Sequence, residues 1–414
     1  MQVETITKNS NGGRDMISIG VDVSKGKSMV CIINSKGEIL YKPYEISHTE
    51  TELCRFVSRI EDLKEDKKVV MEATSSYHLP VVSYLKEKGI FVSVINPLVM
   101  KKYASMTLRK GKTDKLDAIK IANYGIDNWF RLEEYQVADE VYSELRLLGR
   151  QYSHYIKMRV ESKLCLTNML DKTMPGIKRL LSNNSENPER DKLNDFIEEY
   201  WHYDNITKGS EKQFINRYIR WAKKKGYHQS ETKAKQIYAL ASEGIPTLSS
   251  NTPSTKMLVL ESVRVLREID RTLANILSQM RKMARGLKEY EVVREMGGVG
   301  ETLAPRLIAE IGDVKRFKTG SSLIAYAGID TPPHESGNFI GSKRRISKRG
   351  SSLLRKTGYE VMKCLKVNKP PEDPVYLFMI KKELEGKALK VAKIAALNKF
   401  LRIYYARVKE VYTM

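Results

Sequence analysis

Apolar and polar positions alternate in short runs along the first third of the chain. Residues 16–46 contain three apolar runs separated by the turn sequences SKGK and NSKGE, and a glycine-containing turn between apolar runs is typical of β-hairpins. Two more apolar runs, at 67–74 and 90–97, predict a fourth and a fifth strand. The first third of the chain is therefore expected to form a five-stranded sheet.

Helices are predicted between these strands. Thr49 and Glu52 have the spacing of a capping box, so a helix should begin after Thr49. Residues 76–89 form a second helical pattern, with a proline near its start and a glycine at its end. A third helix follows the fifth strand and leads to the basic loop 107–112, and residues 113–125 predict a fourth helix. This order predicts an α/β domain with a mixed sheet.

Helical periodicity replaces the strand pattern from about residue 134 to about residue 290. Two long amphipathic segments, 140–171 and 255–287, predict an antiparallel helical arm or coiled coil. The basic segment 208–236 between them is predicted to be helical and exposed, and 242–255 is predicted to be a linker. The tyrosines at 142, 152 and 155 fit the core of the arm better than a base-stacking surface.

The pattern changes again after residue 290. The turn GGVG lies between two short helical patterns, and glycines there would let backbone amides approach a phosphate. A basic amphipathic helix is predicted near the C-terminus. The predicted organisation is a disordered leader (1–15), an α/β domain (16–133), a helical arm with a basic insert (134–290) and a small, mainly α domain with a C-terminal helix (291–414).

Charge narrows the class of partner. The chain has 72 Lys and Arg against 50 Asp and Glu, a net charge of +22, which makes nucleic acid the first partner to consider. An anionic membrane surface is the second partner that this charge could attract. No apolar run reaches the roughly 20 residues of a membrane span, and no membrane partner is expected. The cysteines are scattered, which argues against a zinc site or a disulfide framework and suits a reducing cytoplasm.

Four carboxylates in the α/β domain are candidates for a metal site. Asp22 shares one face of the first predicted strand with small residues, and Glu72 ends the buried run VVM of the fourth strand. Asp114 and Asp117 are close to one helical turn apart in the motif TDKLDA. Converging oxygen donors of this kind favour Mg²⁺ or Mn²⁺, and two such ions support phosphoryl transfer.

Each carboxylate also has a structural interpretation. Asp22 could belong to a turn, Glu72 could pair with a lysine, Asp114 could cap its helix and Asp117 could be solvated. The occurrence of all four in the strand order of an RNase H-like domain favours the metal site over these separate interpretations.

Four segments, IGVDVSKGK, VVMEATSSYH, VINPLVMKKYA and GKTDKLDA, resemble the N-terminal domain of the insertion-sequence 110 family of transposases. The motif TDxxDA is the most specific of them. That domain is RuvC-like, with an RNase H-like fold and an Asp-Glu-Asp-Asp set. The resemblance therefore implies that Asp22, Glu72, Asp114 and Asp117 are catalytic metal ligands for Mg²⁺, with Mn²⁺ as a substitute. Residues 297–356 resemble the family's C-terminal transposase domain, although GGVG stands where the family more often has PGIG.

The same resemblance implies a serine nucleophile, and the matching segment HESGN carries it over to Ser336. From the residues alone, Ser336 lies in a glycine- and proline-rich turn, where most serines are turn formers. Ser321, Ser322, Ser342 and Ser351 compete for the role. The basic run that follows suits phosphate contacts and transition-state charge: Lys343, Arg344, Arg345, Lys348 and Arg349.

The function that the resemblance implies is RNA-guided DNA recombination. A structured non-coding guide RNA would select donor and target DNA, and a homo-oligomer, either a dimer or a tetramer, would build composite sites from two subunits. Two other functions stay open: a RuvC-like, structure-selective nuclease that uses water, and a non-catalytic nucleic-acid scaffold.

Overall fold

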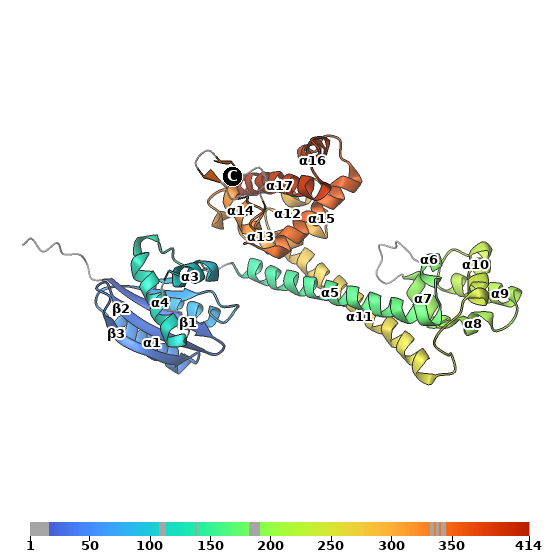
Figure 1. The fold of residues 1–414 in the computed structure, drawn as a ribbon, viewed down its shortest axis with the longest axis horizontal. Helices are drawn as coiled ribbons and strands as arrows, with labels where there is room; N and C mark the ends of the chain where they lie inside the picture. The colour runs from blue at the N-terminus through green and yellow to red at the C-terminus, as the bar shows by residue number, and fades with distance from the viewer. Residues whose placement is uncertain are drawn as a thin grey trace, which may run out of the picture. The chain divides into compact units, whose positions relative to one another are not determined.

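The computed structural model describes residues 16–106, 113–136, 139–181, 191–331, 335–336, 339–340 and 345–413 (Figure 1). The chain forms two compact units, 1–137 and 138–414. The predicted leader at 1–15 and the basic loop at 107–112 lie outside the described residues.

The first unit contains the predicted five-stranded sheet. Its strands are β1 (Met16–Ser24), β2 (Lys27–Asn34), β3 (Ile39–Ser47), β4 (Asp66–Glu72) and β5 (Val92–Ile95). Their spatial order is β3-β2-β1-β4-β5. The pairs β1–β2 and β2–β3 are antiparallel, whereas β1–β4 and β4–β5 are parallel. This is a mixed sheet with the strand order of an RNase H-like, RuvC-like domain, and it confirms the predicted fold of this region.

Helices cover both faces of this sheet. They are α1 (Glu50–Glu61), α2 (Leu79–Glu87), α3 (Pro97–Ala104) and α4 (Asp114–Asp127), and a 3₁₀ turn follows (Trp129–Arg131). The Thr49 hydroxyl accepts a hydrogen bond from the Glu52 amide, as the capping spacing predicted. Side chains of α1 and α2 share a core with Ile17, Ile19 and Val21 on one face of β1. The opposite face of the sheet contacts α4.

Two long helices organise the second unit. The helices α5 (Glu140–Thr173) and α11 (Pro253–Arg285) lie side by side and run antiparallel (Figure 1). One hydrophobic core forms around the start of α5 and the end of α11, and another around the end of α5 and the start of α11. Tyr142 and Tyr152 are buried in the first of these cores, in agreement with their interpretation as core residues. The supercoiling of a coiled coil stays a prediction.

The basic insert differs from its prediction. It forms a helical subdomain of α6 (Ile177–Leu181), α7 (Lys192–Glu199), α8 (Tyr203–Thr207), α9 (Glu211–Lys224) and α10 (Glu231–Glu243). The segment was expected to be exposed, but one face of α9 buries Phe214, Tyr218 and Trp221 in the second core. Aromatic residues on this face and basic residues on the others explain why the composition alone suggested a solvated helix.

The remaining helices pack around the first core. They are α12 (Tyr290–Arg294), α13 (Leu303–Ile311), α14 (Gly320–Ala327), α15 (Ser352–Asn368), α16 (Pro374–Leu384) and α17 (Leu389–Val411), with a 3₁₀ turn (Val314–Arg316) after α13. A two-stranded ribbon, β6 (Glu335–Ser336) and β7 (Phe339–Ile340), follows α14. In the described part of the chain, no helix is both long enough and apolar enough to span a bilayer.

The GGVG turn has a packing role. Gly298 has a φ of +74°, and a Cβ atom there would lie 2.8 Å from the Val361 carbonyl oxygen. A glycine is therefore needed where the turn meets α15. Close packing against a helix explains this glycine without a bound phosphate.

Candidate active site

The parallel pairing of β1 and β4 brings two of the predicted carboxylates to the same edge of the sheet. The ladder pairs Val21 with Met71, so Asp22 and Glu72 come next on their strands. Val70 packs on the α4 side of the sheet, while Met71 packs on the other side. Because side chains alternate along a strand, Glu72 and Asp22 belong to the α4 side. Both side chains are half-buried.

The helix α4 supplies the other two carboxylates in its first turn. The N-cap is Thr113, whose hydroxyl accepts a hydrogen bond from the Leu116 amide at 3.2 Å. Asp114 is therefore not the capping residue, which removes the structural interpretation considered for it. Asp114 is exposed and Asp117 is half-buried. Negative charge in the first turn of a helix is also favourable in the field of the helix dipole.

Small residues on β1 set how closely α4 approaches the sheet. A Cβ atom on Gly20 would lie 2.3 Å from both the carbonyl oxygen of Ala118 and the amide nitrogen of Ala122. A Cβ atom on Gly125 would lie 2.1 Å from the hydroxyl oxygen of Ser18. The small residues beside Asp22 were expected to leave room next to a lone carboxylate. Instead, the backbone of α4 fills that room, and this contact places Asp114 and Asp117 over the strand.

All four carboxylates line one cavity of about 890 Å³. The predicted set Asp22, Glu72, Asp114 and Asp117 is therefore brought together by the fold, although the four residues are up to 95 positions apart in the sequence (117 − 22). Carboxylate oxygens are the donors that Mg²⁺ and Mn²⁺ prefer. Within the described residues, no group of three or more His, Cys, Asp or Glu side chains is close enough to hold a metal ion as the side chains stand.

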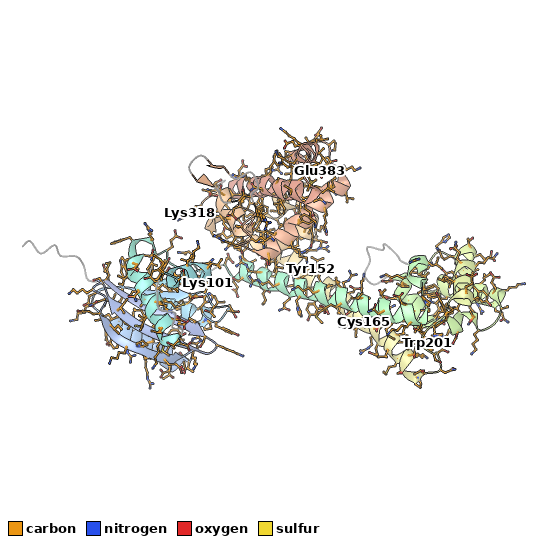
Figure 2. The ribbon with its side chains drawn as sticks, in the orientation of Figure 1. Lys101, Tyr152, Cys165, Trp201, Lys318 and Glu383 are labelled. Carbon is orange, nitrogen blue, oxygen red and sulfur yellow. The ribbon has the colours of Figure 1, made fainter. Side chains whose placement is uncertain are left out.

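Lysines share the cavity with these carboxylates. Lys120 Nζ lies 2.8 Å from Asp117 Oδ1, and Lys27 Nζ lies 2.8 Å from Glu45 Oε2. The hydrogen bond and charge of Glu45 raise the pKa of Lys27, and the charge of Asp114 contributes to the same shift. Lys101 of α3, labelled in Figure 2, also lines the cavity. A cavity with both acidic and basic side chains is suited to a metal ion together with a phosphate.

These lysines were not identified from the sequence. Lys120 could have been found, because it lies three positions after Asp117 on the same helix, a spacing at which opposite charges meet. Lys27 and Lys101 come from a different strand and a different helix, and their proximity depends on the tertiary fold.

Ser336 lies in the second unit, in the ribbon strand β6, where it pairs with Phe339 of β7. The structure describes its backbone and not its side chain. Of the basic run that follows, Lys343 and Arg344 lie outside the described residues, whereas Arg345, Lys348 and Arg349 are exposed. The competing Ser351 is accounted for structurally, because its hydroxyl donates to Glu310 Oε2 at 2.8 Å and caps α15.

Hydrogen bonds close the base of the loop that carries Ser336. The amide of Ser347 donates to the carbonyl oxygen of Asp330 at 2.9 Å. The amide of Lys348 donates to the carbonyl oxygen of Gly328, also at 2.9 Å. The Ser347 hydroxyl also donates to the Asp330 carboxylate. Arg355 adds a bond from its guanidinium to the Ala327 carbonyl oxygen at 2.9 Å. The residues before and after the loop are thereby held together as a clamp.

Two family comparisons match the two parts that carry these residues. A sequence model described as a transposase, for the Asp-Glu-Asp-Asp domain of IS110, matches residues 19–175. A second, described as the transposase IS116/IS110/IS902 family, matches residues 290–376. The chain belongs to the IS110 family of transposases. The first match spans all four carboxylates of the cavity, and the second spans Ser336 and the basic run.

Curated relatives agree with this membership of the IS110 family. The chain is 21% identical to the insertion element IS116 uncharacterized 44.8 kDa protein of Streptomyces clavuligerus, over 90% of this chain and 89% of that protein. It is 20% identical to the pilin gene-inverting protein of Moraxella bovis, over 95% of each chain. It is 22% identical to the transposase for insertion sequence element IS1111A of Coxiella burnetii, over 86% of this chain and 79% of that protein.

A solved structure is also similar to part of this IS110-family chain. It is titled "T. thermophilus RuvC in complex with Holliday junction substrate" and matches with 11% identity and a TM-score of 0.22 over 28% of this chain and 96% of that chain.

Proposed function

We propose that this transposase cuts and rejoins DNA strands through a serine nucleophile, with Mg²⁺ held by Asp22, Glu72, Asp114 and Asp117. The observation that carries the proposal is the single cavity into which two strands and one helix bring these four carboxylates. Membership of the IS110 family makes the chain a transposase or recombinase, an enzyme that acts on DNA. The metal, the nucleophile and the RNA guide go beyond that family assignment.

In the proposed reaction the Ser336 hydroxyl attacks the scissile phosphate. Its proton leaves, the bond between Oγ and phosphorus forms, one ester bond of the DNA strand breaks, and the departing DNA oxygen takes up a proton. The energy of the phosphodiester is kept in the phosphoserine bond, so a DNA hydroxyl can reverse the step without ATP. When bound, Mg²⁺ would neutralise the phosphate and favour attack. Arg345, Lys348 and Arg349 would stabilise the charge of the transition state.

The proposal also includes partners. A structured guide RNA selects donor and target DNA, as the family resemblance implies, and the carboxylates of one subunit act with Ser336 of another in a dimer or tetramer. The net charge of +22 supports contact with both nucleic acids.

The experiment is denaturing electrophoresis of nicked suicide DNA substrates with the full chain and its guide RNA. We expect the wild type to give a covalent protein–DNA adduct that is absent in Ser336→Ala and in Asp117→Ala. Ser321→Ala is the matched control and should form the adduct, because Ser321 lies on α14 outside the loop. Ca²⁺ should bind in place of Mg²⁺ without supporting cleavage, since its coordination is looser. Full activity in excess chelator would exclude the metal.

The runner-up function is a RuvC-like nuclease that hydrolyses DNA with water. The specific observation in its favour is that the four-carboxylate cavity is complete within the first unit. Free DNA ends produced equally by wild type and Ser336→Ala would establish this function in place of strand transfer. Binding without any cleavage by the wild type would instead indicate a scaffold.

A further inference from the structure

The helical subdomain α6–α10 lies outside both segments that match the transposase family, which end at 175 and begin again at 290. It has its own hydrophobic core, built partly from Phe196, Phe214 and Trp221. A folded subdomain with no counterpart in the family matches needs its own functional explanation.

A basic groove runs over α8 and α9 of this subdomain. It consists of two cavities of about 530 Å³ and 450 Å³ that share Lys208, Arg217 and Arg220. Lys224 and the single carboxylate Glu199 complete its charged lining. On α9, residues 217, 220 and 224 lie on one helical face. They span roughly 10 Å along the helix axis, which corresponds to about three phosphates of one strand.

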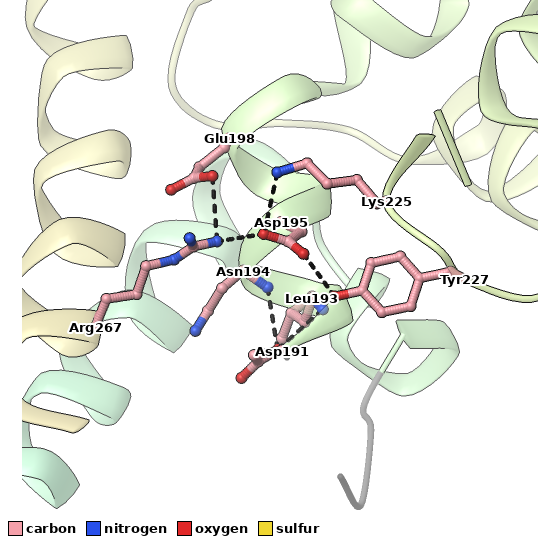
Figure 3. A network of polar contacts seen from close by, with 8 residues as sticks. All are labelled: Asp191, Leu193, Asn194, Asp195, Glu198, Lys225, Tyr227 and Arg267. Carbon is pink, nitrogen blue, oxygen red and sulfur yellow. Dashed lines mark hydrogen bonds and ion pairs between the residues drawn. The ribbon is translucent and has the colours of Figure 1, made fainter. Parts of the chain in front are cut away.

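Among the residues that the structure describes, the cations of this groove have no carboxylate partner. None of Lys208, Arg217, Arg220 and Lys224 forms an ion pair in the part of the chain that the structure describes. The neighbouring Asp195 network shows the opposite arrangement (Figure 3). There, Arg267 Nη2 lies 2.6 Å from Asp195 Oδ1 and 3.1 Å from Glu198 Oε2. Arg267 is thus paired with two acids, whereas the four cations of the groove have no carboxylate partner among the described residues.

Arg217 is held in place without a carboxylate. Its Nη2 donates to the carbonyl oxygens of Ile206 and Lys208, both at 3.2 Å. Its guanidinium carbon also lies 6.0 Å from the centroid of the Tyr200 ring and 5.8 Å from that of Phe214. These contacts fix the side chain and leave its positive charge intact, which reduces the entropy lost when an anion binds.

Unused hydrogen-bond donors point to the same class of ligand. Trp221 and Asn205 both line the groove, and Trp221 is 6% exposed. Trp221 Nε1 and Asn205 Nδ2 are buried N–H donors without an acceptor in the described structure. A buried donor without a partner is costly. Cations and donors together call for a ligand that is negatively charged and rich in acceptors.

We propose that this groove binds the phosphodiester backbone of nucleic acid. Phosphate oxygens satisfy arginine, lysine and N–H donors at once, and the proposal requires no reading of base sequence. The inference rests on the proposed function insofar as the enzyme must hold DNA and RNA. It assigns a task to a part of the chain that the cleavage site does not use.

The test measures binding of the full chain to a fluorescent DNA duplex and to an RNA hairpin of equal charge. The groove variant combines Lys208→Gln, Arg220→Gln and Lys224→Gln, all at exposed positions. The matched control combines Lys212→Gln, Lys223→Gln and Lys235→Gln, which remove the same charge from exposed positions of α9 and α10 outside the groove. Arg217 is left unchanged because it also supports the fold.

We expect the groove variant to bind about 10-fold more weakly than wild type, while the control stays close to wild type. The slope of the logarithm of the binding constant against the logarithm of salt concentration should become shallower by roughly 2 to 3 in the groove variant. A loss of binding to only the DNA duplex or only the RNA hairpin identifies that nucleic acid as the source of the phosphate. A loss of binding to both probes indicates a shared backbone site. A charge-preserving variant, Lys208→Arg with Arg220→Lys and Lys224→Arg, should restore binding.

Equal losses in groove variant and control, or no loss in either, would overturn the groove proposal. The outcome is separable from that of the proposed function. Adduct formation at Ser336 can fail while groove binding persists, and groove binding can fail while Ser336 still forms its adduct.

Discussion

Gly20 of β1 lies directly against Ala118 of α4, and a Cβ atom on the glycine would come within 2.3 Å of the alanine carbonyl oxygen. The neighbour is helix backbone, which cannot rotate away as a side chain can. Ala122, one helical turn after Ala118, meets the same glycine. The position of Asp114 and Asp117 over the sheet therefore depends on Gly20 having no side chain.

Gly20→Ala should consequently disturb both stability and activity. We expect a loss of about 1–3 kcal/mol, since an added methyl group must move α4 away from the strand. Strand cleavage should fall more than stability, because the displaced helix carries two of the four carboxylates. Thermal unfolding and the cleavage assay measure the two effects. Gly300→Ala is the control for stability, because no atom lies within 4 Å of its Cβ position. Unchanged unfolding in Gly20→Ala would contradict the packing argument.

Lys120 is expected to compete with the metal for Asp117. Its Nζ is 2.8 Å from Asp117 Oδ1, and both side chains are about a quarter exposed, at 23% and 27%. Removing this charge in Lys120→Gln should let a divalent cation bind more tightly, by about 5-fold if the screened charge repulsion is ~1 kcal/mol. The Mg²⁺ concentration that gives half-maximal cleavage measures the change. Lys115→Gln removes the same charge from an exposed position of α4 outside the cavity and should have little effect.

A higher Mg²⁺ requirement in Lys120→Gln would show that this lysine assists the reaction more than it competes with the ion. In that case its role would be contact with the phosphate, and the apparent affinity for DNA should decrease in the same variant.

The fold of the first unit could be predicted because its sequence signals are local. Turn sequences separate β1, β2 and β3, and Thr49 and Thr113 cap the helices that follow them. The convergence of Asp22 and Glu72 followed from parallel pairing of their strands, which strand order implies. Two lysines of the cavity, Lys27 and Lys101, could not be found in this way, since they approach it from separate elements.

The second unit was less predictable for a different physical reason. Helical periodicity identifies a helix, but it does not say which other helix covers its apolar face. The segment that became α9 is rich in Lys and Arg, and its buried aromatics were outweighed by charge in the composition. The role proposed for Ser336 depends on the family resemblance, because a serine in a glycine-rich turn has no chemical signature of its own.

Buried tyrosines should make the α6–α10 subdomain sensitive to alkali. Burial raises the pKa of Tyr200 and of Tyr218 to about 12. The pKa of tyrosine in an unfolded chain is about 10. The folded state therefore favours the protonated phenol, and its stabilisation is complete below pH ~10 and is lost as the pH rises toward 12. Tyrosinate absorbance and circular dichroism, followed together, should show these phenols ionising as the subdomain unfolds.

Tyr218→Phe is the informative variant for this effect. The Tyr218 hydroxyl is buried without a hydrogen-bond partner in the described structure, so its removal leaves no acceptor or donor unsatisfied. We expect unchanged or increased stability at pH 7 and an alkaline unfolding transition shifted to higher pH. A large loss of stability at pH 7 would show that the hydroxyl has a partner that matters.

The clamp between Asp330 and Ser347 should position the Ser336 loop for reaction. Ser347 donates to Asp330 through both its hydroxyl and its amide, and the second contact is 2.9 Å long. Ser347→Ala removes the hydroxyl bond and keeps the backbone bond, at a cost of about 1 kcal/mol in stability. We expect the rate of adduct formation to fall at least about 10-fold, since small misplacements of a nucleophile are costly in rate.

Two measurements separate positioning from a general loss of folding. The apparent affinity for DNA should stay near that of wild type in Ser347→Ala while the rate of adduct formation falls, because the loop base and not the phosphate contacts has changed. Ser347→Thr keeps a hydroxyl and should recover most of the rate. Ser262→Ala, which removes a hydroxyl bonded within α11, is the matched control and should leave adduct formation unchanged. A rate in Ser347→Ala equal to that of this control would mean that the backbone bonds alone hold the loop, and that the Asp330 carboxylate has no part in positioning the nucleophile.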